Sequence, residues 1–187
     1  MRISFYYFYV FVLLILNFLI FLTPILARSG SELAPGLYAG FHNICHQLTA
    51  RSLCMYNNGI SDCTLQAKVF SESTYEVVQN NQGTGYKFPV DARDMAIYLM
   101  MLIGGLVLSF VSDKNGKNIP NILILILAAA PVGIDGFTQL FGWRESTNQI
   151  RLITGVILGL AIPFFLIPTA NVLINKFGRR KITKEEK

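Results

Sequence analysis

The sequence is poor in charge. Asp, Glu, Lys and Arg make up only 14% of its 187 residues, whereas soluble domains carry about 25%. Hydrophobic residues make up 52%, and the mean hydropathy is +0.46. The 16 basic residues outnumber the 11 acidic ones, but many of them follow the last apolar run rather than lie among aromatic residues. This distribution argues against nucleic-acid binding and favours a membrane protein.

The common catalytic signatures are also missing. The chain has no glycine-rich phosphate loop, no G-x-S-x-G elbow and no H-E-x-x-H pair. It has no evident internal repeat of the kind from which many transporters are built. Any chemistry must therefore come from individual polar residues and their placement.

Four apolar runs cross, or nearly cross, a hydrocarbon core of roughly 30 Å at about 1.5 Å per residue. They cover Phe5–Leu22, Met95–Val111, Ile119–Gly142 and Ile150–Ile174. The first run is longer than a signal-peptide core, and Ile25 is a poor residue two positions before Ala27, so we expect an uncleaved helix. The sequence predicts an all-α membrane protein with four transmembrane helices and a small extracytoplasmic loop region.

The basic tail predicts how the chain crosses the cell membrane. Its positive residues are Lys176, Arg179, Arg180, Lys181, Lys184 and Lys187. Positive charge marks the cytoplasmic side, so we expect both termini there and the long polar segment outside. The predicted units are residues 1–27 as the first helix, 28–93 as the extracytoplasmic segment, 94–175 as a three-helix core and 176–187 as the tail.

The extracytoplasmic segment holds all three cysteines of the chain. On an oxidising face we expect a disulfide between Cys54 and Cys63, which leaves Cys45 as the odd thiol. In the same segment, residues 75–78 and 86–88 flank an Asn-Asn-Gln-Gly turn and predict a short β-hairpin. Two strands alone are marginally stable, so this hairpin needs something to pack against.

A metal site is an alternative use of this segment. Cys45 and His46 are metal-competent residues, and Asp91 and Asp94 supply carboxylates where the segment enters the second helix. Their spacing matches no established zinc motif, and the sequence names no cofactor. The simpler interpretation of Asp91 is an N-cap of that helix.

The main candidate site surrounds the turn between the last two helices. Asp135, Arg144 and Arg151 are the candidate catalytic residues, because ionisable groups among lipid-facing residues are costly and usually functional or paired. The candidate substrate-binding residues are Arg93, Gln139, Ser146, Asn148, Gln47 and Arg51. Either Asp135 pairs with Arg151 or Arg93 and ties the helices together, or the arginines hold an anion in a cavity open to the outer face, with Asp135 as base, ligand or counter-charge.

Three motifs together resemble a known family. They are Cys45-His46-Gln47, Ala92-Arg93-Asp94 and the polar pattern that runs from Pro131 to Gly155. With their neighbours, from about Tyr38 to Gly159, they resemble the predicted membrane proteins called domain of unknown function 2085. The resemblance implies that the motifs form one unit, and it implies no reaction.

The sequence departs from that family at one point. Comparable members carry Cys-x-Arg-Cys or Cys-x-Arg-Asp before an Ile-Tyr pair, whereas this chain has Asp91 at the first position and Asp94 at the last. The absent thiol pair argues against redox chemistry of the Cys-x-x-Cys type.

Two functions fit these observations. One is an enzyme or carrier-type site that binds or processes an anionic or lipid-linked molecule on the outer face. The other is a non-catalytic accessory subunit, in which the charges join helices and the outer segment docks a membrane-protein partner or a second copy. The bilayer is the expected partner in both cases.

Overall fold

The computed structural model describes residues 5–63 and 76–185, with side chains described only up to Lys176 in the last helix. Its four long helices are α1 (Phe5–Arg28), α3 (Ala92–Val111), α4 (Ile122–Leu140) and α5 (Asn148–Glu185). All four are long and apolar enough to cross a membrane, α5 over Asn148–Lys176. This confirms the predicted set of four spans. Most residues of the predicted basic tail have no described side chain.

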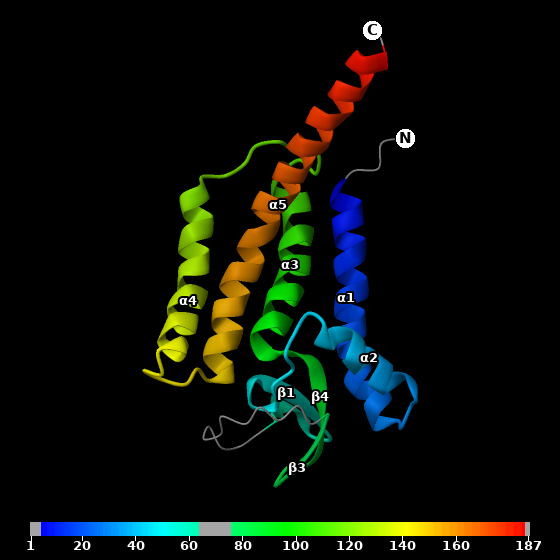
Figure 1. Ribbon diagram of the computed structural model, residues 1–187, viewed down its shortest axis with the longest axis vertical. Coiled ribbons are helices and arrows are strands. Elements are labelled where there is room, and N and C mark those ends of the chain that lie inside the picture. The colour runs from blue at the N-terminus through cyan, green and yellow to red at the C-terminus, as the bar shows by residue number, and fades with distance from the viewer. Residues whose placement is uncertain (1–4, 64–75, 186–187) are drawn as a thin grey trace.

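The long helices stand in a row in the order α4, α5, α3, α1 (Figure 1). The α3–α5 contact is the most extensive of the row, and α5 presents the Gly155/Gly159 pair to the backbone of α3. A Cβ atom on Gly155 would lie 2.7 Å from the carbonyl oxygen of Arg93, and one on Gly159 would lie 2.6 Å from that of Ile97. Small residues at four-residue spacing permit such an approach between transmembrane helices.

Polar side chains fasten α1 to α3. The Tyr9 hydroxyl donates to the carbonyl oxygen of Met101 at 2.9 Å, and the Asn17 amide donates to that of Tyr98 at 3.1 Å. The Tyr9 ring also lies over Gly105, where a Cβ would approach it to 2.7 Å. Such bonds satisfy groups that lipid cannot.

Helix α4 is packed differently. Asp135 is the one residue of α4 that is buried, and the rest of the helix is half-buried or exposed. Because its apolar residues face outward, α4 depends on its contact with α5 and on the polar contacts of Asp135 for its place in the row.

At one end of the helices lies a cap of α2 (Leu33–His42), the short 3-10 helix η1 (Thr49–Arg51) and a four-stranded antiparallel sheet. The strands are β1 (Ser52–Tyr56), β2 (Gly59–Asp62), β3 (Val77–Asn80) and β4 (Gly83–Asp91), in the order β2-β1-β4-β3. The predicted hairpin is confirmed as β3–β4, although Tyr75 lies outside the described residues. The β1–β2 hairpin, which turns at Asn57-Asn58-Gly59, was not predicted from the sequence.

The second hairpin supplies the support that the first one needs. Strand β1 pairs with β4, so the two hairpins join into one sheet. Strand β4 then continues directly into α3 (Figure 1). Phe88 and Val90 of β4 are buried with Ile20 of α1 and Phe41 of α2. This apolar cluster holds the cap on the ends of α1 and α3.

Candidate functional site

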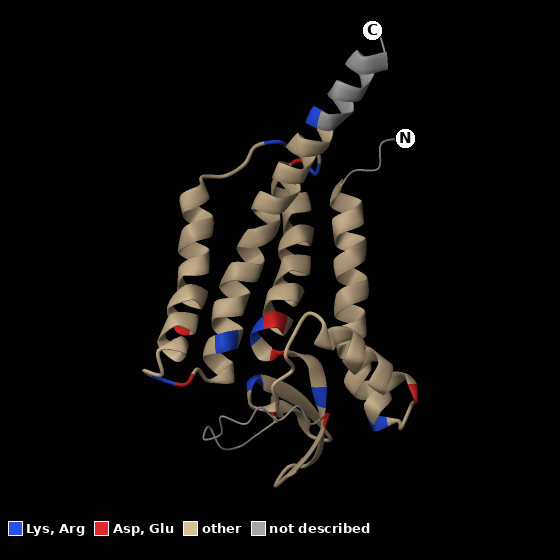
Figure 2. Cartoon of the chain, viewed as in Figure 1, with Lys and Arg blue, Asp and Glu red and all other residues tan. Residues whose placement is uncertain are grey.

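Charged residues gather where the cap meets α3, α4 and α5. Figure 2 shows the middle of the helices free of charged residues, with acidic and basic positions gathered along the chain at the cap end. The cluster takes Arg93 from the first turn of α3, Asp135 from α4, Arg151 from the first turn of α5 and Arg51 from η1. Residues far apart in sequence therefore meet at one level of the molecule.

Asp135 is the centre of one half of the cluster. Its side chain is 2% exposed and accepts from Arg93 on α3, from Arg144 at 2.6 Å and from the Ser146 hydroxyl at 2.6 Å. Arg144 also donates to the Thr138 hydroxyl at 3.3 Å. The sequence offered Arg93 or Arg151 as partners of Asp135, and the structure pairs it with Arg93 and Arg144. Both carboxylate oxygens thus have at least one partner.

Arg51 and Arg151 form the other half, around Gln139. With the amide of Gln139 oriented so that its oxygen faces them, that oxygen accepts from both guanidinium groups at 3.0 Å; amide orientation is assigned from such contacts. Arg151 is 5% exposed and also donates to the amide oxygen of Asn148 at 3.4 Å. Across the described residues, both ion pairs belong to Asp135, so neither Arg51 nor Arg151 has a carboxylate within 4.0 Å.

Asp91 lies at the junction of β4 and α3. Asp91 is the N-cap residue of α3 by position, as the sequence suggested, but its side chain makes no capping hydrogen bond. One carboxylate oxygen of Asp91 and the Nε of Arg93 are buried without a hydrogen-bond partner. Burial, and then the charge of Asp94, raise the pKa of Asp91. Desolvation and a like charge both favour the neutral carboxyl.

Cys45 is buried next to Asp91, whose backbone N–H donates to its sulfur at 3.3 Å. Burial, and then the charge of Asp91, raise the pKa of the thiol to about 12. His46, the next residue, is exposed. The described part of the chain contains no group of three His, Cys, Asp or Glu side chains that could hold a metal ion.

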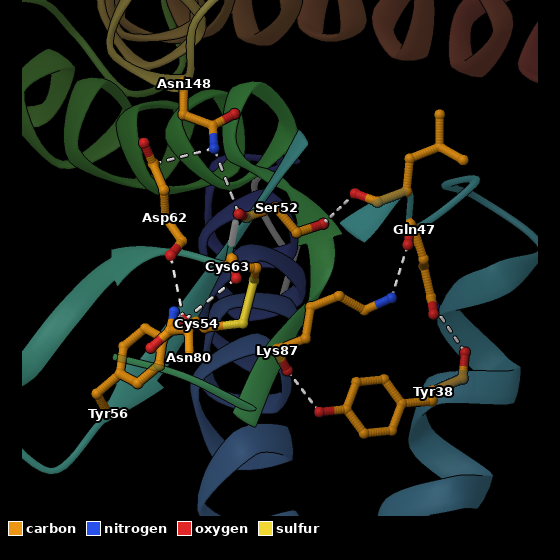
Figure 3. Close-up of a disulfide and its surroundings, with 11 residues drawn as sticks. Tyr38, Gln47, Ser52, Cys54, Tyr56, Asp62, Cys63, Asn80, Lys87 and Asn148 are labelled. Carbon is orange, nitrogen blue, oxygen red and sulfur yellow. Dashed lines mark hydrogen bonds between the residues drawn. A yellow bond between two sulfur atoms is a disulfide. The ribbon is translucent and has the colours of Figure 1, made fainter. Parts of the chain in front are cut away.

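Gln47 contacts the cap rather than the arginines. Its backbone is left-handed, with φ of 54°, and its side-chain amide donates to the carbonyl oxygen of Tyr38 at 2.7 Å. The backbone carbonyl of Gln47 accepts from the ammonium group of Lys87 at 2.6 Å. The Tyr38 hydroxyl in turn donates to the backbone carbonyl of Lys87, so the three residues are linked to one another (Figure 3). The expected substrate-binding residue Gln47 thus makes bonds within the cap.

Lys87 is a residue that the sequence analysis missed. It lies in the middle of β4 with 0% exposure, and burial lowers the pKa of its ammonium group. The sequence feature that could have indicated its burial is its place in an otherwise apolar or aromatic stretch, between Tyr86 and Phe88 and before Pro89 and Val90. A buried lysine needs an acceptor, and the carbonyl of Gln47 supplies one.

Asn148 fastens the start of α5 to the cap. Its amide donates to the carbonyl oxygen of Ser52 at 3.3 Å and to the carboxylate of Asp62 at 3.0 Å. Ser52 directly follows Arg51, and Asp62 directly precedes Cys63. The predicted disulfide between Cys54 and Cys63 is confirmed (Figure 3). The β1–β2 hairpin therefore helps to place Arg51 opposite Arg151.

Thiol counting tests this arrangement of the cysteines. We expect the native protein at pH 8 to react slowly with a maleimide, because Cys45 is buried and its pKa is raised to about 12. Unfolding without reductant should release one thiol, and reduction should release all three. The C45S variant is the control and should release none without reductant. Two or three thiols in the unreduced wild type would contradict the disulfide.

Comparison with known proteins identifies similar chains. A family model described as "Predicted membrane protein (DUF2085)" matches residues 82–165. An uncharacterized protein of Methanocaldococcus jannaschii is 32% identical over 84% of this chain and 86% of its own length. An uncharacterized protein of Methanothermobacter thermautotrophicus is 37% identical over 42% of this chain and 68% of its own. No solved structure matches.

Proposed function

The chain belongs to the predicted membrane proteins described as DUF2085, and we propose that it binds the phosphate or carboxylate group of an anionic molecule between Arg51 and Arg151. The observation that carries this proposal is the contact of two guanidinium groups with one neutral amide oxygen, that of Gln139. A neutral acceptor satisfies these hydrogen bonds, but among the described residues neither guanidinium group forms an ion pair, although the nearby Asp91 carboxylate attracts both.

Burial makes this arrangement expensive without an anion. A buried charge is stable when it is paired and hydrogen-bonded. Arg151 is 5% exposed, and Arg51 adds a second positive charge beside it. Asp91 lies near both arginines, but burial raises the pKa of its carboxyl group, so its compensation of their charge is weakened. An anion with two or three oxygens accepts from both planar guanidinium groups at once, which is the geometry in which arginine binds phosphate and carboxylate well.

The remaining polar residues have different tasks in this proposal. Arg93 and Arg144 are engaged with Asp135, so they orient α4 and the turn rather than face the ligand. Gln139 sits on α4 one turn after Asp135, so the Asp135 contacts also fix the position of the Gln139 amide. Asp91, with one buried carboxylate oxygen that lacks a partner, is an additional group next to the arginines that can accept or hold a proton.

The ligand reaches this site from the cap side of the membrane. By the positive-inside rule, the basic tail lies in the cytoplasm and the cap faces outward. An anionic lipid of the outer leaflet, or an anion dissolved outside the cell, then has access to Arg51 and Arg151.

Lysine substitution at Arg151 tests the proposal. We expect R151K to bind the anion at least about tenfold more weakly, because lysine keeps the charge but loses the planar fork, and a hydrogen bond to a charged group contributes about 1.5–3 kcal/mol. Binding is measured by calorimetry on detergent-purified protein with two probes, inorganic phosphate and short-chain phosphatidic acid.

The control is R28K, which changes an exposed arginine at the end of α1. It should leave both dissociation constants unchanged, and equal thermal unfolding midpoints should show that R151K is folded. Preference for phosphatidic acid identifies a lipid ligand, and equal affinity identifies a free anion. The proposal is wrong if the wild type binds neither probe, or if R151K binds both as tightly as the wild type.

A further inference from the structure

Three aromatic side chains stack at the cap end of α4. The rings of Phe137 and Phe141 lie 6.1 Å apart, and those of Phe141 and Trp143 lie 5.5 Å apart, with interplanar angles of 22° and 27°. All three are exposed, by 65%, 60% and 77%. We call Phe137, Phe141 and Trp143 the aromatic ridge. We infer that the aromatic ridge inserts into the headgroup region of the bilayer and sets the depth of α4.

The ridge belongs to the outermost helix of the row and to the turn that follows it. Helix α4 stands at the opposite side of the row from α1, whereas the sheet lies below α3 and α1 (Figure 1). Next to the ridge, Leu140 is 81% exposed and Ile134 is 64% exposed. The exposed aromatic surface therefore continues into the exposed apolar surface of a helix that sits in lipid.

The length of α4 places the ridge at the boundary of the hydrocarbon core. Its 19 residues span about 28 Å at 1.5 Å per residue, close to the roughly 30 Å of a hydrocarbon core. If the Ile122 end of α4 lies at one boundary of the hydrocarbon core, its Leu140 end lies at the other boundary. Phe141 and Trp143 then lie where the chain leaves the hydrocarbon core. Trp and Tyr are enriched at this level, and large apolar rings are well accommodated there. The charged Arg144 and Glu145 come next in the chain.

This placement also gives the depth of the polar cluster. Asp135 precedes Leu140 by one and a half turns, so it lies about 7.5 Å inward along the helix axis. An anchored ridge then holds Asp135 and its arginines just beneath the headgroups, within reach of lipid. A lipid in that leaflet approaches the cluster without leaving the bilayer. The inference on the ridge itself does not depend on which anion binds.

The single tryptophan of the chain makes the depth measurable without mutation. Wild-type protein is reconstituted into phosphatidylcholine vesicles whose lipids carry bromine at acyl positions 6,7 or 11,12, and iodide is added outside. We expect 6,7-brominated lipid to quench Trp143 at least about twofold more than 11,12-brominated lipid, because the ridge lies at the boundary of the core. Iodide should quench Trp143 several-fold less than it quenches free N-acetyltryptophanamide.

The matched control moves the tryptophan along the same helix. W143F combined with L127W places it at an exposed position about 20 Å from Leu140 along the helix axis, and there 11,12-brominated lipid should quench more strongly. Absence of quenching by either brominated lipid in the wild type would overturn the inference, because it would mean that water or a second copy surrounds the ridge. Stronger quenching at 11,12 in the wild type would overturn it as well.

Discussion

Replacing Asp135 with leucine is expected to lower the free energy of unfolding by about 3–5 kcal/mol, the cost of removing one partner from a buried ion pair. The carboxylate is 2% exposed and accepts from Arg93, Arg144 and Ser146. Without it, two guanidinium groups keep their charge but lose their acceptor. Arg93, with a side chain 21% exposed, contributes more of the loss than Arg144, which is 43% exposed and better solvated.

The loss should be concentrated in α4. Because Asp135 is the buried residue of that helix, D135L should detach the cap end of α4 while α3 and α5 stay packed. The measurements are unfolding in mixed detergent micelles and protease sensitivity of the Phe141–Thr147 turn. Ser146→Ala removes one hydrogen bond to the Asp135 carboxylate, and a hydrogen bond to a charged group contributes about 1.5–3 kcal/mol, so we expect a smaller loss than that of D135L.

A double variant separates charge from packing. D135L combined with R93M replaces the central ion pair with apolar side chains of similar size, which is often neutral or stabilising for a buried pair. We therefore expect the double variant to recover much of the stability that D135L loses. If D135L alone is as stable as the wild type, Asp135 does not hold α4 in place.

Replacing Gly159 with leucine should have the second large effect. A Cβ at this position would lie 2.6 Å from the carbonyl oxygen of Ile97 and 2.8 Å from the Cβ of Met100. Backbone atoms cannot rotate away, so the side chain must separate α3 from α5. Overpacking costs about 1–3 kcal/mol, and we expect the upper end or more because the clash is with backbone atoms of the most extensive helix contact in the row.

Gly133→Leu on α4 is the control for Gly159→Leu. Gly133 is also helical, but a Cβ there has nothing within 4 Å. The same change therefore adds the same side chain without a clash, and its unfolding midpoint should stay near that of the wild type or rise slightly. Equal effects of the two substitutions would show that helix propensity, rather than the α3–α5 contact, decides the result.

The apolar runs predicted the four spans well but their ends less well. The third run was expected over 119–142, and α4 covers Ile122–Leu140. Its start follows from Asn121, whose side chain accepts from the N–H of Leu123 as an N-cap, and from Pro120, which disfavours a helical conformation at Ile119 before it. At the other end, Gly142 has φ of +69°, where the chain turns towards α5. Local capping, rather than hydropathy, set both limits.

The cap was less predictable because its order comes from pairing between distant segments. The β3–β4 hairpin had a visible turn and flanking apolar residues, whereas β1 and β2 became recognisable only through the pairing of β1 with β4. Lys87 gives the same lesson. A lysine is expected at the surface, and its burial depends on the carbonyl of Gln47 from another part of the cap.

The sequence by itself determined that this is a membrane protein with four spans and a long polar segment between the first two, because hydropathy is a local property. It also led us to expect the Cys54–Cys63 disulfide in that segment, which the structure contains. It also restricted the polar cluster to a few arginines and aspartates. Only the tertiary structure decided which of them pair. In the folded protein, Asp135 forms ion pairs with Arg93 and Arg144. Arg51 and Arg151 instead donate to the amide oxygen of Gln139. That division depends on distances of a few ångströms between segments remote in sequence, which no local pattern encodes.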